Sequence, residues 1–539
     1  MLRFNINEEN TMKKSLYVII TLLIIGIISG CGGNEEKKSE IAAIMEIEPN
    51  NEREQAMDIA DGMVMEGLID EKLDQDWYKI SVTSDTMFDL RAELTGIPDI
   101  NLKMELFDAE SELLLEVNRY KEGDGEFITN YTLKPGDYFI RVRELWLKSQ
   151  EKKFNDSLRY SLRIDLNEVT KYIEQESNNK GVLATTLEPE IEMIGYISPY
   201  KDVDWYTLKL PSEQDTYIEL SLSGVEGVNT KLRVYDPIEA LIKTVDQGKR
   251  GEGETITNLG VDTEREFYYV VIEGGDWQTN ELQSYKLQAR FIHLTHKIEF
   301  EPNDRLVKAT ELVASDSICG FIDSGDDVDW YRIAKNDDRT HIARIEVSGI
   351  PKTDIKMTIT NELEEELLSV DERGEMEGEI FANVGLEQRQ DYYLKLESKR
   401  KGSNIEDQYC IFMTLDKYFG GDELEINDSH ERANIIDIER AVQGYIHPLG
   451  DVDYYRLEIA DRHLGELQII LSGIMKVNTD FILYDAEMNE LAKAAARREE
   501  GVERLTFEGA PGIYYIKVFD NDGKESNYRD KYQLAIFRK

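Results

Sequence analysis

Apolar and polar residues alternate along most of the chain that follows residue 45, in short runs bounded by Gly, Asp, Asn and Pro. The segments 140–143 and 515–518 show the alternation well. Successive side chains of a β-strand point to opposite faces, so a period of two indicates strands that bury one face. The pattern therefore predicts an all-β chain in which helix is scarce.

The same landmarks recur four times along the chain. Asp-Trp-Tyr at 76–78, 204–206 and 329–331 and Asp-Tyr-Tyr at 453–455 follow one another at steps of about 125 residues, which is one domain length. A Gly-x-Ile sequence precedes each of them by nine residues, starting at Gly67, Gly195, Gly320 and Gly444. Many short strands separated by turns in a unit of this size are typical of a sandwich. We therefore expect four tandem jelly-roll-like antiparallel β-sandwich domains.

These expected domains span residues 46–168, 172–297, 298–417 and 418–539 and are called units 1 to 4 below. In each unit, the aromatic residue directly after the recurring Asp is expected to pack between the two sheets, because aromatic side chains contribute large buried area to such cores. The linkers between the units are short, which favours a semi-rigid rod.

The amino terminus carries the pattern of a secretion signal, in which a basic pair precedes an apolar run at 16–28 and small residues lead to Cys31. The run is short for a membrane span, which needs about 20 apolar residues. It resembles a bacterial lipoprotein signal peptide, although an uncleaved helical anchor stays open. The resemblance implies a signal peptide at 1–30 with its true start at Met12, a lipidated Cys31 and a linker over 31–45.

No second long apolar segment follows Cys31. We therefore expect the body of the protein to face outside the cytoplasm, held at the cell membrane by the lipid on Cys31.

A formal net charge of −45 argues against nucleic acid as a partner, because binding to phosphates needs clustered Lys and Arg. Cations are the natural partners of such a chain. Acidic excess also keeps an exported protein soluble, and this alternative explanation of the charge requires no bound cation.

The acidic residues form a repeated pattern. Each unit opens with Glu-x-Glu-x-Asn-Asx, at Glu46, Glu48, Asn50 and Asn51, at Glu174, Glu176, Asn178 and Asn179, at Glu299, Glu301, Asn303 and Asp304, and at Glu423, Glu425, Asn427 and Asp428. Each unit also holds Asp-x-Asp, at Asp74 and Asp76, Asp202 and Asp204, Asp327 and Asp329, and Asp451 and Asp453.

Six oxygen-bearing side chains per unit are enough for calcium, which takes about six to eight oxygen ligands. In an extended segment, alternate residues project to the same side, which places both Glu and the Asn together. The alternative is that Asn-Asx makes turns and that the Asp residues cap loops. Because both motifs occur together in four copies, we favour calcium as a hypothesis.

Glu-x-Glu-Pro-Asn-Asn, the Gly-x-Ile strand and Asp-x-Asp-Trp-Tyr resemble the bacterial pre-peptidase C-terminal domain family and, within the same pattern, the clostridial collagen-binding domains. The resemblance covers nearly all of 46–539. It implies a jelly-roll-like sandwich found on secreted proteins, often beside a peptidase, with calcium between the acidic segment and the aspartate loop in the collagen-binding members. It carries over no collagen-contacting surface. Ser177 and Ile426 depart from Pro49 and Pro302, which puts the rigidity of those two segments in doubt.

We expect no catalytic activity. The four units leave no stretch long enough for a catalytic domain, and the chain holds neither His-Glu-x-x-His nor Gly-x-Ser-x-Gly. A metal pair at His293 and His296 is an alternative to surface or linker histidines. Besides Cys31 the chain holds only Cys319 and Cys410, so the fold cannot depend on a disulfide framework. These two cysteines could form a disulfide or remain two free thiols.

These expectations lead to one function and two alternatives. The first is an adhesive or scaffold lipoprotein that binds an extracellular protein or glycan, with calcium stiffening each junction to the preceding unit. The second is an envelope accessory protein that recruits or presents a separate secreted hydrolase. The third is a hydrolase with an unfamiliar site in a sandwich cleft.

Overall fold

The computed structural model describes residues 42–145, 152–212, 216–275, 278–294, 296–335, 337–460, 465–494 and 501–539. In these residues the only helices are four short 3-10 helices, η1 (Arg53–Gln55), η2 (Gly181–Leu183), η3 (Leu306–Lys308) and η4 (His430–Arg432). The predicted all-β chain is confirmed. The described helices are all too short and polar to cross a bilayer. The predicted signal peptide 1–30 and Cys31 lie outside the described residues.

Units 1 and 2 contain the first half of the strands. Those of unit 1 are β1 (Ile44–Met45), β2 (Met57–Asp58), β3 (Val64–Ile69), β4 (Gln75–Val82), β5 (Phe88–Leu94), β6 (Leu102–Phe107), β7 (Leu113–Val117), β8 (Glu126–Leu133), β9 (Gly136–Glu144) and β10 (Asn155–Glu168). Those of unit 2 are β11 (Thr185–Thr186), β12 (Met193–Ile197), β13 (Val203–Lys209), β14 (Thr216–Leu222), β15 (Thr230–Tyr235), β16 (Leu241–Val245), β17 (Glu254–Gly260), β18 (Phe267–Gly274) and β19 (Asn280–His293).

Units 3 and 4 contain the second half. The strands of unit 3 are β20 (Thr310–Val313), β21 (Ser317–Ile322), β22 (Val328–Ala334), β23 (His341–Val347), β24 (Ile355–Asn361), β25 (Glu366–Val370), β26 (Ile380–Leu386), β27 (Tyr392–Ser398) and β28 (Asn404–Lys417). Those of unit 4 are β29 (Asn434–Ile436), β30 (Ala441–Ile446), β31 (Val452–Ile459), β32 (Gly465–Ser472), β33 (Thr479–Tyr484), β34 (Glu490–Ala494), β35 (Val502–Gly509), β36 (Gly512–Asp520) and β37 (Asn527–Arg538).

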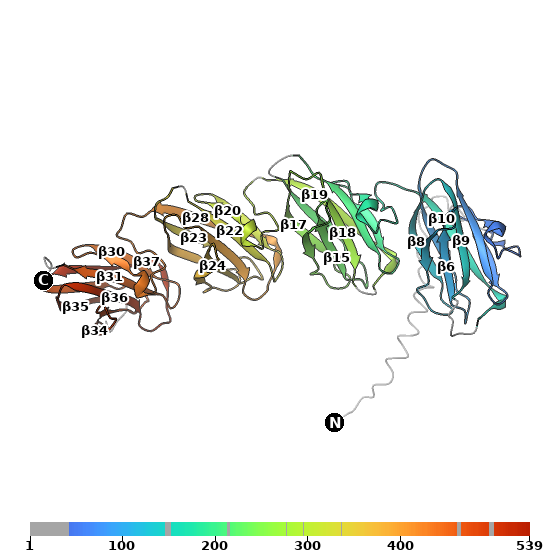
Figure 1. The fold of residues 1–539 in the computed structure, drawn as a ribbon. Helices are drawn as coiled ribbons and strands as arrows, with labels where there is room; N and C mark the ends of the chain where they lie inside the picture. The colour runs from blue at the N-terminus through green and yellow to red at the C-terminus, as the bar shows by residue number, and fades with distance from the viewer. Residues whose placement is uncertain are drawn as a thin grey trace, which may run out of the picture.

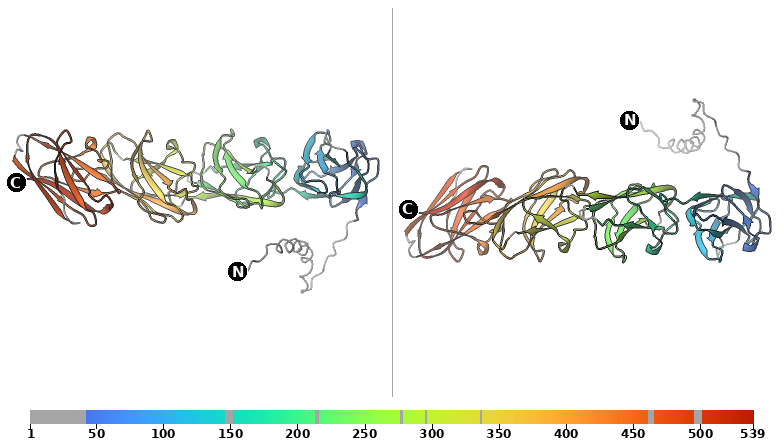
Figure 2. Two further views of the ribbon diagram at one scale, coloured as in Figure 1. Left: turned by 90° about the horizontal axis from the view of Figure 1, so that it is seen from below. Right: turned by 90° about the horizontal axis from the view of Figure 1, so that it is seen from above.

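One strand order recurs four times, in two sheets per unit. Sheet I has the orders β3-β10-β5-β8, β12-β19-β14-β17, β21-β28-β23-β26 and β30-β37-β32-β35, and β1 extends it in unit 1. Sheet II has the orders β2-β4-β9-β6-β7, β11-β13-β18-β15-β16, β20-β22-β27-β24-β25 and β29-β31-β36-β33-β34. The pairs are antiparallel except where a short first strand joins in parallel, as β2 joins β4. The units follow one another in a row in all three views (Figures 1 and 2).

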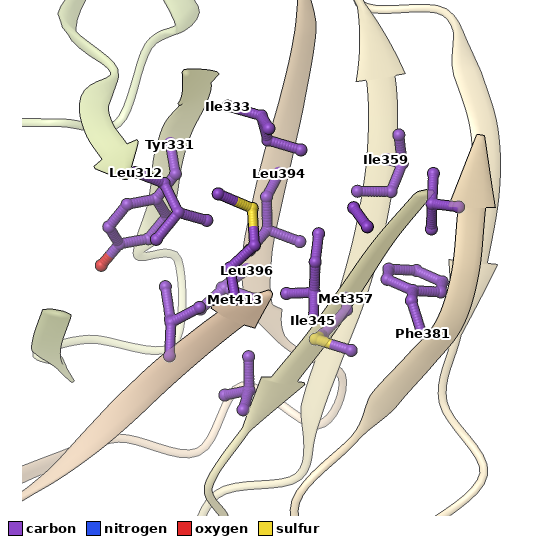
Figure 3. Close-up of a cluster of buried hydrophobic side chains, with 14 of the residues drawn as sticks. Leu312, Tyr331, Ile333, Ile345, Met357, Ile359, Phe381, Leu394, Leu396 and Met413 are labelled. Atoms are coloured by element: carbon purple, nitrogen blue, oxygen red, sulfur yellow. The ribbon is translucent and has the colours of Figure 1, made fainter. Parts of the chain in front are cut away.

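Each unit has a hydrophobic cluster of its own, formed by the alternating inward residues of its two sheets. In unit 3, Ile345 and Phe381 from sheet I face Met357 and Leu394 from sheet II (Figure 3). Burying one such side chain stabilises a fold by about 1.5–3 kcal/mol. Ile426, from the start of unit 4, packs on the cluster of unit 3, so neighbouring units share apolar contact.

The predicted position of the aromatic residue after each Asp is wrong. Tyr78, Tyr206, Tyr331 and Tyr455 lie in the clusters, whereas the preceding Trp or Tyr does not. Trp77 instead contacts Phe107, with ring centroids 5.2 Å apart, and Arg141. Because side chains alternate along a strand, Asp76 and Tyr78 share the inner face and Trp77 must take the outer one.

Cys319 and Cys410 form a disulfide, which settles the question that the sequence left open. They are directly opposite each other on β21 and β28, which are adjacent in sheet I of unit 3 although they are its first and last strands in chain order. Neither cysteine belongs to the hydrophobic cluster, so the bond lies on the outer face of the sheet.

Candidate metal centres

The two acidic stretches of each unit come together. The backbone N–H of Trp77 donates to the carbonyl of Asn50 at 3.2 Å, which places the opening segment against the start of β4. Carboxylate oxygens then lie within 4.8 Å of one another in four groups, which we call centres 1 to 4: Glu46, Glu48 and Asp76; Glu174, Glu176 and Asp204; Glu301, Asp323 and Asp327; and Glu423, Glu425 and Asp453.

Each centre contains buried oxygen atoms that accept no hydrogen bond from any described residue. They are Oδ1 of Asn50, Asp74 and Asp76; Oε1 of Glu176 with Oδ1 of Asn178, Asp202 and Asp204; Oε1 of Glu301 with Oδ1 of Asn303, Asp327 and Asp329; and Oε1 of Glu425 with Oδ1 of Asn427 and Asp453. Leaving a buried acceptor unpaired costs about 1–3 kcal/mol, and more for a charged group. The Asn oxygen and the oxygen of the second Asp recur in all four units, and those of the second Glu and the first Asp recur in three units each. A common function explains this recurrence better than four separate defects.

The second oxygen of each of these carboxylates is held in place, as centre 3 illustrates. The N–H of Asp323 donates to Asp327 Oδ2 at 2.6 Å, and the Tyr409 hydroxyl donates to Asp329 Oδ2 at 2.7 Å. The N–H of Asn303 donates to Glu301 Oε2 at 3.1 Å. One oxygen of each carboxylate is thus anchored, and the unpartnered one is aimed at the centre without freedom to turn away.

The first Glu of each opening segment is fully hydrogen-bonded. Glu299 accepts from the N–H of Phe321 at 2.8 Å and from the hydroxyls of Tyr331 and Tyr409 at 2.6 and 2.8 Å. Glu174 and Glu423 accept from the equivalent residues of units 2 and 4. The first Glu therefore supports the centre through its tyrosine pair, and the second Glu of the segment is the one with an oxygen to offer.

The glycine of each Gly-x-Ile strand leaves room for this support. A Cβ atom on Gly320 would overlap the carboxylate of Glu299 and lie 2.5 Å from the Tyr409 hydroxyl. Gly67, Gly195 and Gly444 meet the equivalent Glu and Tyr in the same way. The recurring glycine thus marks the close approach of a buried carboxylate to the backbone.

The last residue of the Glu-x-Glu-x-Asn-Asx motif has a different role from the predicted one. Asn51 Oδ1 accepts from the N–H of Gln75 at 3.0 Å, and Asn179 and Asp428 accept from the N–H of Val203 and Val452. Asp304 is exposed. Asn51, Asn179 and Asp428 anchor the start of a strand, because neighbouring side chains in an extended segment point to opposite sides and these residues face away from the side of Asn50 and its equivalents. The peptide bond after the second Glu is cis in all four units, including those with Ser177 and Ile426.

Burial raises the pKa values of several carboxylates in the centres. Burial, and after it the charge of Glu174, raises the pKa of Glu176 to about 8. Burial also raises the pKa of Asp74 to about 6, with Glu48 adding to the effect. Desolvation and like charges both penalise the ionised form, and a bound cation would relieve both. The donor set fits calcium, which accepts carboxylate and amide oxygens and completes its shell with water or carbonyl oxygen.

Centres 2, 3 and 4 lie against the preceding unit through contacts that the sequence did not reveal. Asn130 Nδ2 donates to Glu174 Oε1 at 2.5 Å, and Asn258 and Asn383 donate to Glu299 and Glu423 at 3.5 and 2.7 Å. The three asparagines stand four residues after a Glu in β8, β17 and β26, a spacing that could have identified them. In unit 4 the corresponding position after Glu503 is Phe507.

The family model of the bacterial pre-peptidase C-terminal domain matches residues 74–144. No curated protein matches the chain. Among solved structures, the pre-peptidase C-terminal domain of a Bacillus anthracis collagenase is 22% identical, and the match covers 20% of this chain and 99% of that domain at a TM-score of 0.17. A protein from Eubacterium rectale is 10% identical over 44% of this chain and 79% of its own, at a TM-score of 0.15.

A β-glucuronidase from Parabacteroides merdae is 11% identical over 41% of this chain and 28% of its own, at a TM-score of 0.13. Residues 74–144, which begin at the first Asp-x-Asp pair, thus match the bacterial pre-peptidase C-terminal domain family that the motifs of unit 1 predicted.

Proposed function

We propose that this protein is a non-catalytic adhesive or scaffold lipoprotein of the cell surface, whose four jelly-roll-like units are stiffened by calcium at their junctions. One observation carries the proposal. Buried, unpartnered oxygens recur at the opening segment of every unit, and in units 2 to 4 that segment bonds to the strand of the unit before it. A cation held there would fix the angle between two consecutive units.

The chemistry of the donors favours calcium over other metals. The centres offer carboxylate and amide oxygens and no thiolate or imidazole among the grouped ligands. Oxygen donors suit hard cations, and the irregular arrangement suits calcium better than magnesium, which demands a near-ideal octahedron. In this proposal Glu176, Asn178, Asp202 and Asp204 would hold the ion of centre 2, with their equivalents in the other units.

The remaining parts of the proposal rest on the sequence. A lipid on Cys31 would hold the chain at the membrane, and a row of units would present binding surface away from it. The partner would be an extracellular protein or glycan, because the net charge of −45 opposes binding to nucleic acid. Binding without catalysis agrees with a chain that repeats one unit and carries no recognisable hydrolase motif.

Small-angle X-ray scattering of the chain from residue 32 onward would test the stiffening. With calcium we expect a narrow distribution of end-to-end lengths, and with chelator a broader and shorter one. The double variant Asp204→Asn/Asp453→Asn should lose much of the calcium response, whereas Asp485→Asn, a turn residue outside the centres, should keep it. Scattering curves of the native chain that coincide with and without calcium would rule out the stiffening role.

A second candidate is an envelope accessory protein that recruits a secreted hydrolase. The family match favours it, because the matching model is named for a domain associated with peptidases. Co-purification of the chain from a secreting culture, followed by assays for peptidase and glycosidase activity, would separate the two. Hydrolase activity that follows the chain would favour recruitment, and its absence would favour adhesion.

A further inference from the structure

In units 2 to 4, one position at the edge of the centre contacts the preceding unit. It is the residue directly after the Gly-x-Ile strand, which is Asp70, Ser198, Asp323 and His447 in units 1 to 4. The Ser198 hydroxyl lies 3.1 Å from the hydroxyl of Thr129, and His447 Nε2 lies 2.7 Å from the carbonyl oxygen of Ile380. Both partners belong to the unit before. This position therefore sets the chemistry with which each junction is closed.

At the junction of units 2 and 3 the closing contact is ionic. The ammonium of Lys243, on β16 of unit 2, lies 3.0 Å from Asp323 Oδ2 and 3.1 Å from Glu301 Oε2. The side chains of Lys243 and Glu301 are only 10% and 1% exposed. Water screens this contact little, and the loss of one partner would leave the other charge buried and unpaired.

A lysine at this position is peculiar to unit 2. The last two strands in the order of sheet II are β15 and β16 in unit 2, where Lys243 pairs with Val234. The equivalent pairs are Leu115 with Leu106 in unit 1, Leu368 with Ile359 in unit 3 and Ala492 with Leu483 in unit 4. The equivalent leucines contact the hydrophobic clusters of units 1 and 3. Unit 2 thus gives up an apolar contact for a cation, and the next unit is the one that places Asp323 opposite that cation.

The carboxylate of Glu301 faces two cation positions at once. Its Oε1 is unpartnered and belongs to the set formed with Asn303, Asp327 and Asp329, which we call position A. Its Oε2 is shared between the N–H of Asn303 and the ammonium of Lys243, in a place we call position B. In unit 2, position B would lack its second carboxylate because Ser198 stands in place of Asp323.

We propose that Lys243 fills position B of centre 3 in place of a second metal ion, and so keeps units 2 and 3 joined when metal is removed. Position A rests on the proposed calcium binding, whereas the closure of the junction by Lys243 does not. The contact between units 2 and 3 would therefore persist in chelator.

Hydrogen exchange and metal counting on the chain from residue 32 onward would test this. The variants are Lys243→Leu, which copies units 1 and 3, and Lys243→Leu/Asp323→Ser, which copies the neutral closure of unit 2. Lys231→Leu removes a lysine of the same unit, paired with Asp246 at 3.2 Å, and serves as the control for charge. Protection of amides 298–304 is followed in calcium and in chelator, and bound calcium is counted by mass spectrometry of the metal.

In the native chain and in Lys231→Leu, we expect 298–304 to stay protected in chelator. In Lys243→Leu this protection should become calcium-dependent, and the calcium count should rise by one. In the double variant the count should return to the native value. Unchanged protection and an unchanged count in Lys243→Leu would overturn the proposal. If the native chain binds no calcium, the proposed function fails; loss of protection in Lys243→Leu would then still support the closure by Lys243, and its retention would refute both.

Discussion

Units 1 and 3 have closely similar centres in sequence, but the surroundings of the two centres differ. Both open with Glu-x-Glu-Pro-Asn, and both carry Asp after the Gly-x-Ile strand. In unit 3 the second Glu, Glu301, is only 2% exposed, whereas its equivalent Glu48 is exposed. Strand β17 of unit 2 covers centre 3, because Gly260 N–H donates to the carbonyl of Glu301 at 2.9 Å. Within the described residues, no strand covers Glu48 in this way.

The difference shows that the environment of a centre is a property of the junction and not of the motif alone. The second Glu of the opening segment, Glu48, is solvated in unit 1, whereas its equivalent Glu301 is desolvated in unit 3. Unit 3 also has reinforcements that unit 1 lacks in its described part, namely the disulfide and the lysine of its neighbour.

Reduction of the Cys319–Cys410 disulfide should destabilise unit 3 and leave unit 1 unchanged. The bond closes a long loop, with a sequence separation of 91 residues, and a native disulfide of this kind is worth about 2–4 kcal/mol. Hydrogen exchange with and without reductant would resolve the units within one sample, with the peptides of unit 1 as the internal control. Equal protection of unit 3 in both conditions would contradict the expected contribution.

Gly320→Ala should cost about 1–3 kcal/mol in unit 3, because the added methyl group overlaps a buried carboxylate that cannot move aside. A Cβ on Gly67 would overlap the buried Tyr160 hydroxyl, but Glu46 is only partly buried and can turn toward water, so Gly67→Ala should cost somewhat less. Gly374→Ala is the matched control, since a Cβ there meets no atom within 4 Å. Equal losses at Gly320 and Gly67, measured by chemical denaturation followed by hydrogen exchange, would remove the distinction between the two centres.

Asn258→Ala should loosen unit 3 by about 0.5–1.5 kcal/mol, the usual worth of one hydrogen bond. The amide of Asn258 donates to Glu299 at 3.5 Å, so a value at the lower end is expected. Protection of the opening segment of unit 3 should fall, and unit 1 should not respond. Thr255→Ala, three residues earlier in the same strand, is the control, and an equal response to both changes would mean that the amide has no special role.

The metal-free chain should become less stable as the pH rises. Burial, and then Glu48, raises the pKa of Glu46 to about 7, and burial raises that of Glu301 to about 7 although Lys243 opposes the shift. A carboxyl group whose folded pKa exceeds its unfolded value of about 4.3 contributes stability at low pH and loses it as the pH approaches 7. Melting in chelator between pH 5 and 8 would show the loss, calcium should restore stability at the upper end, and a rise in melting temperature with pH in chelator would refute the assignment.

The sequence predicted the parts that depend on local pattern. The period of two indicated the strands, and the fourfold recurrence of Glu-x-Glu and Asp-x-Asp located both halves of each centre. Which neighbour points inward was harder to predict. Either Trp77 or Tyr78 could point into the core, and either Asn50 or Asn51 into the centre. The choice depends on which face of the extended segment each residue occupies, and the sequence does not show this.

Contacts across a junction were beyond sequence reasoning. In the sequence, Lys243 looks like an ordinary exposed residue of a strand. Its role depends on Asp323, a partner 80 positions away in another unit. Asn258 and Asn383 are likewise typical turn-forming residues that happen to lie within a strand. The recurring spacing after a Glu could single these asparagines out, but the partner of each depends on how consecutive units dock, which the sequence does not reveal.

The disulfide of unit 3 has a mechanical consequence. A chain pulled from its ends extends each unfolded unit by about 3.5 Å per residue, but a covalent link between Cys319 and Cys410 transmits the force past everything between them. With a separation of 91 residues, about 320 Å of chain cannot extend under force until the bond is reduced. Unit 3 is thus built as the least extensible segment of a molecule whose other units can lengthen under load.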